Sequence, residues 1–442
     1  MRRPGLALLL LLGGCTIGGR LPADAGLEAE DAGSGEEAAD AAWPGRPDAW
    51  IGPCPEGGGA KLPPPPFAYS YVPGWTAEHV AFTQGNTGKP VGGPARWAVT
   101  GIVSTFTFPV DLAPNCADEA HLRLYASDLR HRFWLVEGGE AWPIAGSEDL
   151  GEEDGPGPWA SFFYSGVYGM AHSGMVAQGD TLNVMDRGWL RRISRQPDGS
   201  WSVQTISGKG SKVLESGERG TLAELSTFGK GLTVDPQGNL YFTLQGGLAK
   251  ASPSGEVSWV VTRERVNEDF QAAYASSWPG TAPAYALSLG SGESVGLIFH
   301  RGSGAIYGGG RTWPSVWKVT SEGAFVPLVN FAPDDQMVGN ARWGPGSPAT
   351  YEPHCMMGWG VFDDGVPWAQ NEIPWAVSRY EPERVLVLRA DFTFGLEAAD
   401  YQGFFKMPKG LGLGSDGRTA WARALGDANA STVLRLSKEP SP

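Results

Sequence analysis

The side chains best suited to chemistry in this 442-residue chain are a few isolated histidines and one short run of soft ligands. His172, Lys230 and His354 each precede a short β-prone run. The stretch His354-Cys355-Met356-Met357 carries ligands that suit copper(I). Adjacent residues of a strand point to opposite sides, so one metal ion could not easily gather all four. We therefore predict a structural use of this stretch, and no catalytic residue, metal site or cofactor.

The elements that would position these side chains are clearest in residues 206–262. This stretch contains four short β-prone runs and two compact turns: Gly231–Val234, Leu240–Leu244, Leu248–Ala251 and Glu256–Val261, with turns at Asp235–Gly238 and Pro253–Gly255. Four strands joined in this way predict an antiparallel meander. Such a meander is too small to bury a core alone, so similar neighbours must stack on it.

The same unit recurs along the chain. With the second strand as the marker, six units begin 52 to 66 residues apart, near Leu124, Leu182, Leu240, Ile306, Trp368 and Ala420. The last unit has no fourth strand of its own, and an open ring would leave unpaired strand edges. We therefore predict that an N-terminal run, either Phe67–Val72 or Ile102–Phe108, completes the sixth unit.

The best-matching segments are Ala145-Gly146, Asp154-Gly155, Ala160–Phe162, Leu124–Val136 and Leu182–Ser194. They resemble the NHL-repeat family of β-propellers, closely from about residue 120 to 262 and less closely to 440. The resemblance implies an all-β, six-bladed β-propeller of four-stranded antiparallel blades over residues 66–440, with the ring closed by an N-terminal strand. It implies little about function, because propellers include both enzymes and binding scaffolds.

The turns of such a blade alternate between two faces. The short turns mark a plain face, and the opposite face, which we call the long-loop face, receives the long connectors 147–173, 207–230, 263–294 and 330–357. Loops on a rigid scaffold are where binding usually resides, so this is the expected functional face. The residues that we expect to contact a ligand there are His172, Lys230, Arg130, Arg187, Arg311, His354, Trp313 and Trp343.

Asp128 and Asp186 end second strands at equivalent places. Repetition at equivalent positions argues for a structural turn role, because catalytic groups are usually unique to one blade. Arg130, Arg187 and Arg311 lie in the same loops and could either bind an anionic ligand or stay solvated.

The tryptophans fall into two groups. Those on third and fourth strands are predicted to pack between sheets: Trp134, Trp189, Trp317, Trp201 and Trp259. Those in loops are better placed to stack on a sugar ring: Trp159, Trp278, Trp313 and Trp343.

The alternative is a propeller hydrolase or lyase with a metal in the central opening. Six-bladed relatives include peptidyl-hydroxyglycine amidating lyases, and that resemblance would imply a ring of histidine zinc ligands. The corresponding places carry His172, Lys230, Ser294-Val295, His354–Met357 and Lys409, so three histidines are not evident. Calcium-dependent propeller lactonases need converging carboxylates, which the first strands here do not offer. His172 and His354 would be the participants in such an enzyme.

Residues 1–14 combine a charged start with a short leucine-rich run, which is typical of a secretory signal peptide. Leu12-Gly13-Gly14-Cys15 resembles a bacterial lipobox, which implies lipidation of Cys15; ordinary signal cleavage is the alternative. Several acyl chains would anchor the protein stably at a membrane. We therefore expect it in the bacterial cell envelope, at the outer membrane or the periplasmic face.

Residues 15–65 are predicted to form a disordered tether. Between Leu21 and Asp48 there are eight acids and one base, with almost no large apolar residue. This composition cannot bury enough surface to order itself.

At most one disulfide can form if Cys15 carries lipid, because three cysteines then remain. Cys54 with Cys116 is the favoured pair, since it would tie the tether to the first blade in an oxidising compartment. Cys116 with Cys355 is the rival pair.

The charge balance bears on the partner. The chain has 34 Lys and Arg against 48 Asp and Glu, a formal charge of −14, which disfavours nucleic acid as a partner. We therefore expect a monomeric, lipid-anchored propeller that binds a protein, peptide or glycan through the long-loop face and performs no chemistry.

Overall fold

The computed structural model describes the chain in segments, all within the compact unit Asp48–Pro442. The described residues are 75–82, 92–95, 98, 103–110, 123–128, 130–147, 149–163, 174–186, 189–208, 231–244, 246–277, 296–309, 316–331, 341–343, 354–361, 367–373, 376–381, 384–388, 394–395, 408–413, 419–425 and 431–438. Beyond residue 327, and at scattered earlier positions, the backbone alone is described.

The strands in these segments form six antiparallel sheets. Four sheets are meanders with described side chains, and we call them the first to fourth blades. The first contains β3 (Val103–Thr107), β4 (Arg123–Asp128), β5 (Phe133–Glu137) and β6 (Glu140–Ala145). The second contains β8 (Met175–Gln178), β9 (Thr181–Asp186), β10 (Trp189–Arg195) and β11 (Trp201–Ser207). The third contains β12 (Leu232–Val234), β13 (Leu240–Leu244), β14 (Gly247–Ala251) and β15 (Val257–Val261). The fourth contains β16 (Gly296–His300), β17 (Ala305–Gly309), β18 (Val316–Val319) and β19 (Phe325–Phe331).

In the other two sheets, the strands beyond residue 350 are described by their backbone. One sheet contains β21 (His354–Val361), β22 (Pro367–Ile373), β23 (Ala376–Glu381) and β24 (Arg384–Leu388). The other contains β26 (Pro408–Leu413), β27 (Thr419–Leu425), β28 (Ser431–Lys438) and β1 (Trp75–Ala81).

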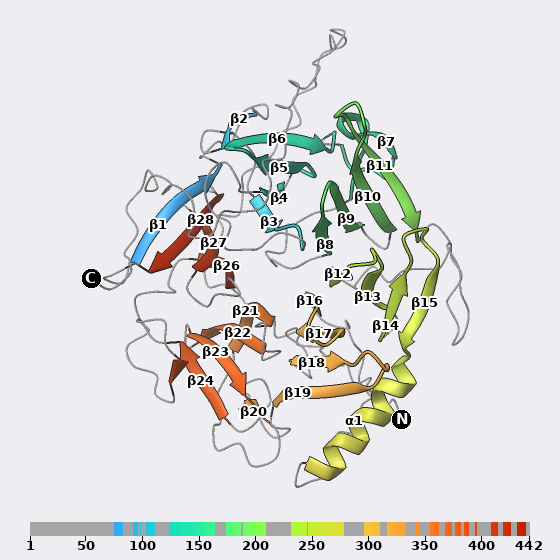
Figure 1. Cartoon of the computed structure of the whole chain (residues 1–442), viewed down its shortest axis with the longest axis vertical. Helices are drawn as coiled ribbons and strands as arrows, with labels where there is room; N and C mark the ends of the chain where they lie inside the picture. Colours follow the sequence, from blue (N-terminus) through green and yellow to red (C-terminus); the bar gives the residue numbers. More distant parts are fainter. Residues whose placement is uncertain are drawn as a thin grey trace, which may run out of the picture. The chain divides into compact units, whose positions relative to one another are not determined.

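The sheets pack in a β-propeller arrangement. The first strands of the four blades contact one another in chain order, β3 with β8, β8 with β12 and β12 with β16. Figure 1 shows these strands innermost, and the fourth strands of the meanders, β6, β11, β15 and β19, farther out. All six predicted marker residues lie in the second strand of a sheet. A closed ring of six blades stays a prediction.

The prediction of four strands per blade was wrong for several sheets. A short fifth strand pairs with the outermost strand in four of them: β2 (Gly93–Pro94) with β6, β7 (Gly155–Pro156) with β11, β20 (Ala341–Trp343) with β19 and β25 (Phe394–Gly395) with β24. The outer edge of a blade would otherwise present unpaired backbone groups, and these connector segments cover part of it.

An N-terminal strand joins the last sheet, as predicted, but the prediction that Ile102–Phe108 supplies it was wrong. The strand that joins the last sheet is β1, which pairs with β28 from Trp75 opposite Lys438 to Ala81 opposite Val433. The run Ile102–Phe108 instead supplies β3, which pairs with β4 in the first blade. The other predicted run, Phe67–Val72, lies outside the described residues. β1 includes Glu78 and His79, so it does not have the apolar pattern that singled out the other two runs.

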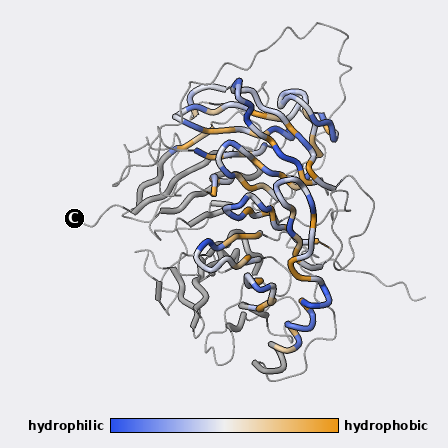
Figure 2. The backbone as a smooth tube through the Cα atoms, turned by 45° about the vertical axis from the view of Figure 1, so that its right-hand side comes forward, coloured by the Kyte–Doolittle hydropathy of each residue, from blue (hydrophilic) through white to orange (hydrophobic). Residues whose placement is uncertain are grey.

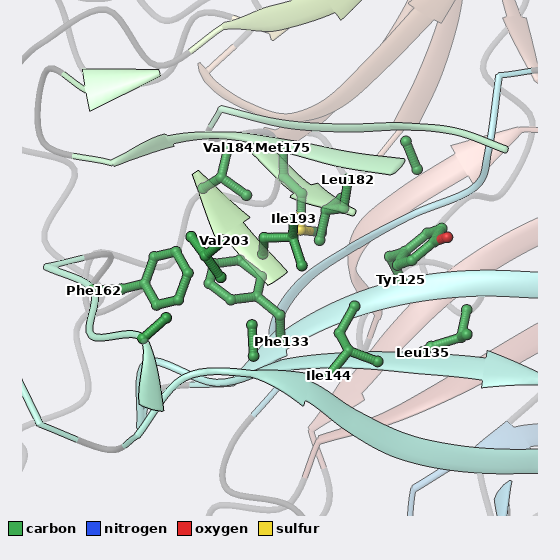
Figure 3. Close-up of a cluster of buried hydrophobic side chains, with 13 residues drawn as sticks. Tyr125, Phe133, Leu135, Ile144, Phe162, Met175, Leu182, Val184, Ile193 and Val203 are labelled. Carbon is green, nitrogen blue, oxygen red and sulfur yellow. The ribbon is translucent and has the colours of Figure 1, made fainter. Parts of the chain in front are cut away.

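Hydrophobic clusters lie between neighbouring blades. Because each blade is covered on both faces, strands such as β4 are buried at every residue and lack the alternation of a half-exposed sheet. Figure 3 shows the cluster between the first and second blades, where Phe133 and Phe162 meet edge to face at 4.7 Å. The predicted packing role is confirmed for Trp134 and Trp317, which are buried in such clusters, and for Trp201.

One α-helix is described, α1 (Arg263–Ser277), and it follows the third blade. Figure 2 shows it as mainly hydrophilic, but Val266 and Phe270 are buried against the fourth blade. In the segments described, no helix is both long and apolar enough to cross a membrane.

Candidate functional site

Most predicted ligand-contacting residues lie where the structure gives no side chain. The residues outside the described segments are His172, Lys230, Arg187, Arg311 and Trp313, as are Cys15, Cys54 and Cys116. His354 and Trp343 lie in β21 and β20, whose backbone alone is described. Arg130 is the candidate whose side chain is described. It lies half-buried in the turn between β4 and β5, on the long-loop face.

The turn of the first blade is organised by Asp128, as predicted for a structural role. Its carboxylate is buried and accepts hydrogen bonds from the backbone N–H groups of Arg130 (2.9 Å) and Arg132 (3.2 Å). It also accepts from Arg132 Nε at 2.9 Å and from Trp134 Nε1 at 3.0 Å. These donors satisfy both oxygens, and the turn is fixed from within the blade.

Asp186, at the equivalent place in the second blade, has different partners, so the prediction of one shared turn role was incomplete. It is also fully buried, but Oδ2 accepts from Arg191 Nη1 (3.1 Å) and from the backbone N–H of Phe163 (3.3 Å). Among the described residues, Oδ1 has no hydrogen-bond partner. Burial raises the pKa of Asp186, while the hydrogen bond and charge of Arg191 and the charge of His131 act in the opposite direction.

Arg191 connects this carboxylate to the chain segment that joins the first two blades. Its guanidinium is fully buried over the Phe162 ring, 4.2 Å from the centroid. Nη1 donates to the carbonyl of Ser161, and Nη2 donates to the carbonyl of Glu153 (2.7 Å) and to Asp154 Oδ1 (3.0 Å). Arg191 therefore holds the described residues of 147–163, which we call the connector, against β10 and β11 of the second blade.

Asp154 extends the connection to the outer strand. Its carboxylate accepts from the backbone N–H (2.8 Å) and hydroxyl (2.9 Å) of Thr205 on β11. Burial acts to raise the pKa of Asp154, but the hydrogen bonds from Thr205 and the charge of Arg191 outweigh it and lower the pKa. The pairing of β7 with β11 lies beside this contact.

Glycine is required directly before the connector. Gly146 has φ +104°, and a Cβ there would collide with the carbonyl of His131 in the neighbouring turn. Trp159 is 68% exposed and Leu150 is 62% exposed, and both lie on the connector. Trp159 was among the loop tryptophans proposed to contact a ligand, and it lies exposed in the short 3-10 helix Gly157–Trp159, directly after the pairing of β7 with β11.

Sequence reasoning missed Arg191. Strand register places Arg191 opposite Val184, as Trp134 lies opposite Ala126, Ala249 opposite Phe242 and Trp317 opposite Gly308. An arginine at a position that elsewhere carries buried Trp or Ala was the available signal.

In the described part of the chain, no three His, Cys, Asp or Glu residues lie close enough together to bind a metal ion.

No family model and no curated protein matches the sequence. Several solved structures resemble the fold. A protein of unknown function from Bacteroides thetaiotaomicron is 11% identical, with a TM-score of 0.45 over 82% of this chain and 76% of that one. An auxiliary nutrient binding protein from Bacteroides ovatus is 10% identical, with a TM-score of 0.41 over 83% and 77%. A gluconolactonase from Xanthomonas campestris is 12% identical, with a TM-score of 0.34 over 72% and 82%. With TM-scores this low, the likenesses carry no functional argument.

Proposed function

We propose that this chain is an exported, lipid-anchored binding scaffold that holds a protein, peptide or glycan on its long-loop face and performs no chemistry. Acyl chains on Cys15 would anchor it in the bacterial cell envelope, residues 15–65 would act as the tether, and Cys54 with Cys116 would form the disulfide. The scaffold would be a closed six-bladed propeller. The pairing of β1 with β28, and the contact of β28 with β3, support closure of the ring.

The observation that carries the proposal is the connector between the first and second blades. A buried arginine and two carboxylates fix it to the scaffold, and its exposed residues include a tryptophan. A binding loop that is ordered before the ligand arrives loses little conformational entropy on binding. An exposed aromatic side chain on a rigid support is a common centre of binding energy.

Affinity capture tests the proposal. The full-length lipidated protein, in detergent, is incubated with the envelope fraction of the producing cells, and the retained proteins and glycans are quantified. We expect specific ligands that are retained by wild type and reduced in the Trp159→Ala variant. The Gln237→Ala variant, changed in an exposed turn on the plain face, is the matched control and should behave as wild type. Retention of nothing above background by wild type would contradict a binding function.

Two further measurements separate this proposal from its alternatives. A propeller hydrolase or lyase with a metal in the central opening requires bound zinc, calcium or copper. Stoichiometric metal in the purified protein, lost on replacing His172 or His354, would establish that alternative over ours. For the anchor, mass spectrometry of the intact protein should find Cys15 acylated at the new N-terminus, and an unmodified thiol would contradict it.

A further inference from the structure

Two exposed apolar side chains lie on the connector. Among the described residues, Leu150 and Trp159 are the large apolar side chains that are exposed, at 62% and 68%. A single exposed apolar residue needs no explanation, because much of any protein surface is apolar. Here two such residues lie on one short segment, and the other described large apolar side chains are at least partly covered. The connector is therefore the described part of the surface where large apolar side chains are exposed.

Backbone contacts bring together the two segments that carry these residues. The connector folds back on itself: Ser147 N donates to the carbonyl of Ala160 (2.9 Å), and Ser161 N donates to the carbonyl of Glu153 (3.2 Å). Gly151 lies so close to the Ser161 hydroxyl that a Cβ there would collide with it. The arm that carries Leu150 therefore lies beside the arm that carries Trp159. We call Asp149, Leu150, Glu152, Glu153 and Trp159 the connector patch.

The connector patch is supported from beneath. Arg191 donates hydrogen bonds to the carbonyls of Ser161 and Glu153, one on each arm of the connector. Phe162 packs against Phe133 in the core between the blades. The Ser161 hydroxyl accepts from Glu153 N at 3.0 Å and ties the arms once more. The patch is therefore ordered in the free protein, and binding need not order it.

The charge of the patch indicates its partner. Asp149, Glu152 and Glu153 are exposed, and residues 147–163 contain no lysine or arginine. An indole face attracts a Lys or Arg cation, and nearby carboxylates add to that attraction. A second copy of the chain would bring like charges together. A neutral glycan carries no positive charge for the three acids to attract. A basic segment with an apolar residue matches both features of the patch.

We propose that the connector patch binds a basic polypeptide segment, with Lys or Arg side chains on the acids and the Trp159 face, and an apolar side chain against Leu150 and Trp159. This inference rests on the proposed binding function and names its class of partner.

Calorimetric titration of the full-length protein tests it, with a short peptide that alternates arginine and leucine as the probe. We expect binding that weakens as salt is raised. Trp159→Ala should weaken it about tenfold or more, the range of a central aromatic anchor. The triple variant Asp149→Asn/Glu152→Gln/Glu153→Gln should bind weakly and lose most of the salt dependence. A neutral oligosaccharide and a glutamate–leucine peptide should not bind.

The matched control neutralises acids elsewhere. Asp198→Asn/Glu322→Gln removes two exposed charges from turns between third and fourth strands, on the plain face, and should bind the peptide as wild type does. Thermal unfolding of the connector variants should match wild type, because their changed side chains are exposed.

The inference would be overturned by no peptide binding, by peptide binding that neither connector variant changes, or by tight oligosaccharide binding that Trp159→Ala abolishes. Self-association lost in Trp159→Ala would also do so, because it would assign the patch to a second copy. If affinity capture succeeds while any of these is found, the binding function stands and the class of partner is wrong.

Discussion

Asp128 and Asp186 occupy equivalent positions in neighbouring blades, but their carboxylates have different hydrogen-bond partners. Asp128 accepts from Arg130 and Arg132 in the adjoining turn and from Trp134 on β5, all within the first blade. Asp186 holds Arg191, which in turn holds the connector. The aspartate at this position therefore stabilises a turn in the first blade, and in the second blade it pairs with the arginine that binds the connector.

The third blade has apolar residues at the positions that Asp186 and Arg191 occupy in the second blade. Leu244 and Ala249 occupy the places of Asp186 and Arg191, and both are fully buried and apolar. The polar pair is therefore not needed to build a blade. The comparison indicates that the second blade carries a buried ion pair because of the connector, and the predictions below test that difference.

The largest effect is expected from Arg191→Ala. Removing one partner of a buried pair leaves Asp186 uncompensated, which should lower the free energy of unfolding by about 3–5 kcal/mol. The double variant Asp186→Leu/Arg191→Ala copies the third blade and should be more stable than the single variant, because apolar residues can replace a buried ion pair at little cost. Urea denaturation measures both. A double variant no more stable than Arg191→Ala would mean that the pair is required by the blade itself.

A smaller effect is expected from Trp134→Phe. The change removes the Nε1 donor while Arg132 and two backbone groups still hold Asp128, so we expect a loss of about 1–3 kcal/mol. Trp317→Phe is the matched control, since Trp317 is buried at the same register position in the fourth blade. The loss at Trp134 should exceed the loss at Trp317 in the same denaturation experiment. Equal losses would show that indole packing alone accounts for the effect.

The smallest effect concerns pH. The pKa of Asp186 is raised above its ordinary value of 3.8, so this group contributes less stability as pH rises from 3.8 through the folded-state pKa. The pKa of Asp154 is lowered below 3.8, so its contribution is present above that pH and is lost as pH falls through the folded-state pKa. Relative to wild type, Asp186→Asn should therefore gain stability with rising pH, and Asp154→Asn should lose it. Slopes of the same sign in the two variants would contradict the different environments assigned to these carboxylates.

The repeat was predictable because its signals are local. Short β-prone runs, tight turns such as Asp235–Gly238 and the marker residues correctly located the second strands. Which N-terminal run joins the last sheet was not predictable, because β1 pairs with strands more than three hundred residues away and its own sequence carries charge. The role of Arg191 was missed for a related reason. Two of its acceptors are backbone carbonyls, of Ser161 and Glu153, which leave no trace in residue type.

The candidate site was harder to predict than the fold. The sequence pointed to the long-loop face by topology and to Trp159 by residue type. The structure adds the contacts that hold the connector, which carries Trp159. The segments that carry Leu150, Trp159 and three acids lie side by side because Ser147 contacts Ala160 and Ser161 contacts Glu153, which join residues eight or more positions apart. No periodicity or motif predicts such contacts.

Hydrogen–deuterium exchange across the connector tests the central claim most directly. In the full-length protein, the amides of Gly146, Ser147, Ser161 and Phe163 are hydrogen-bonded to the connector or to Asp186, and we predict that they exchange slowly, as β9 does. In Asp186→Leu/Arg191→Ala they should exchange rapidly while β9 stays protected. Rapid exchange of these amides in wild type would contradict the account, because the connector would then not be held on the second blade.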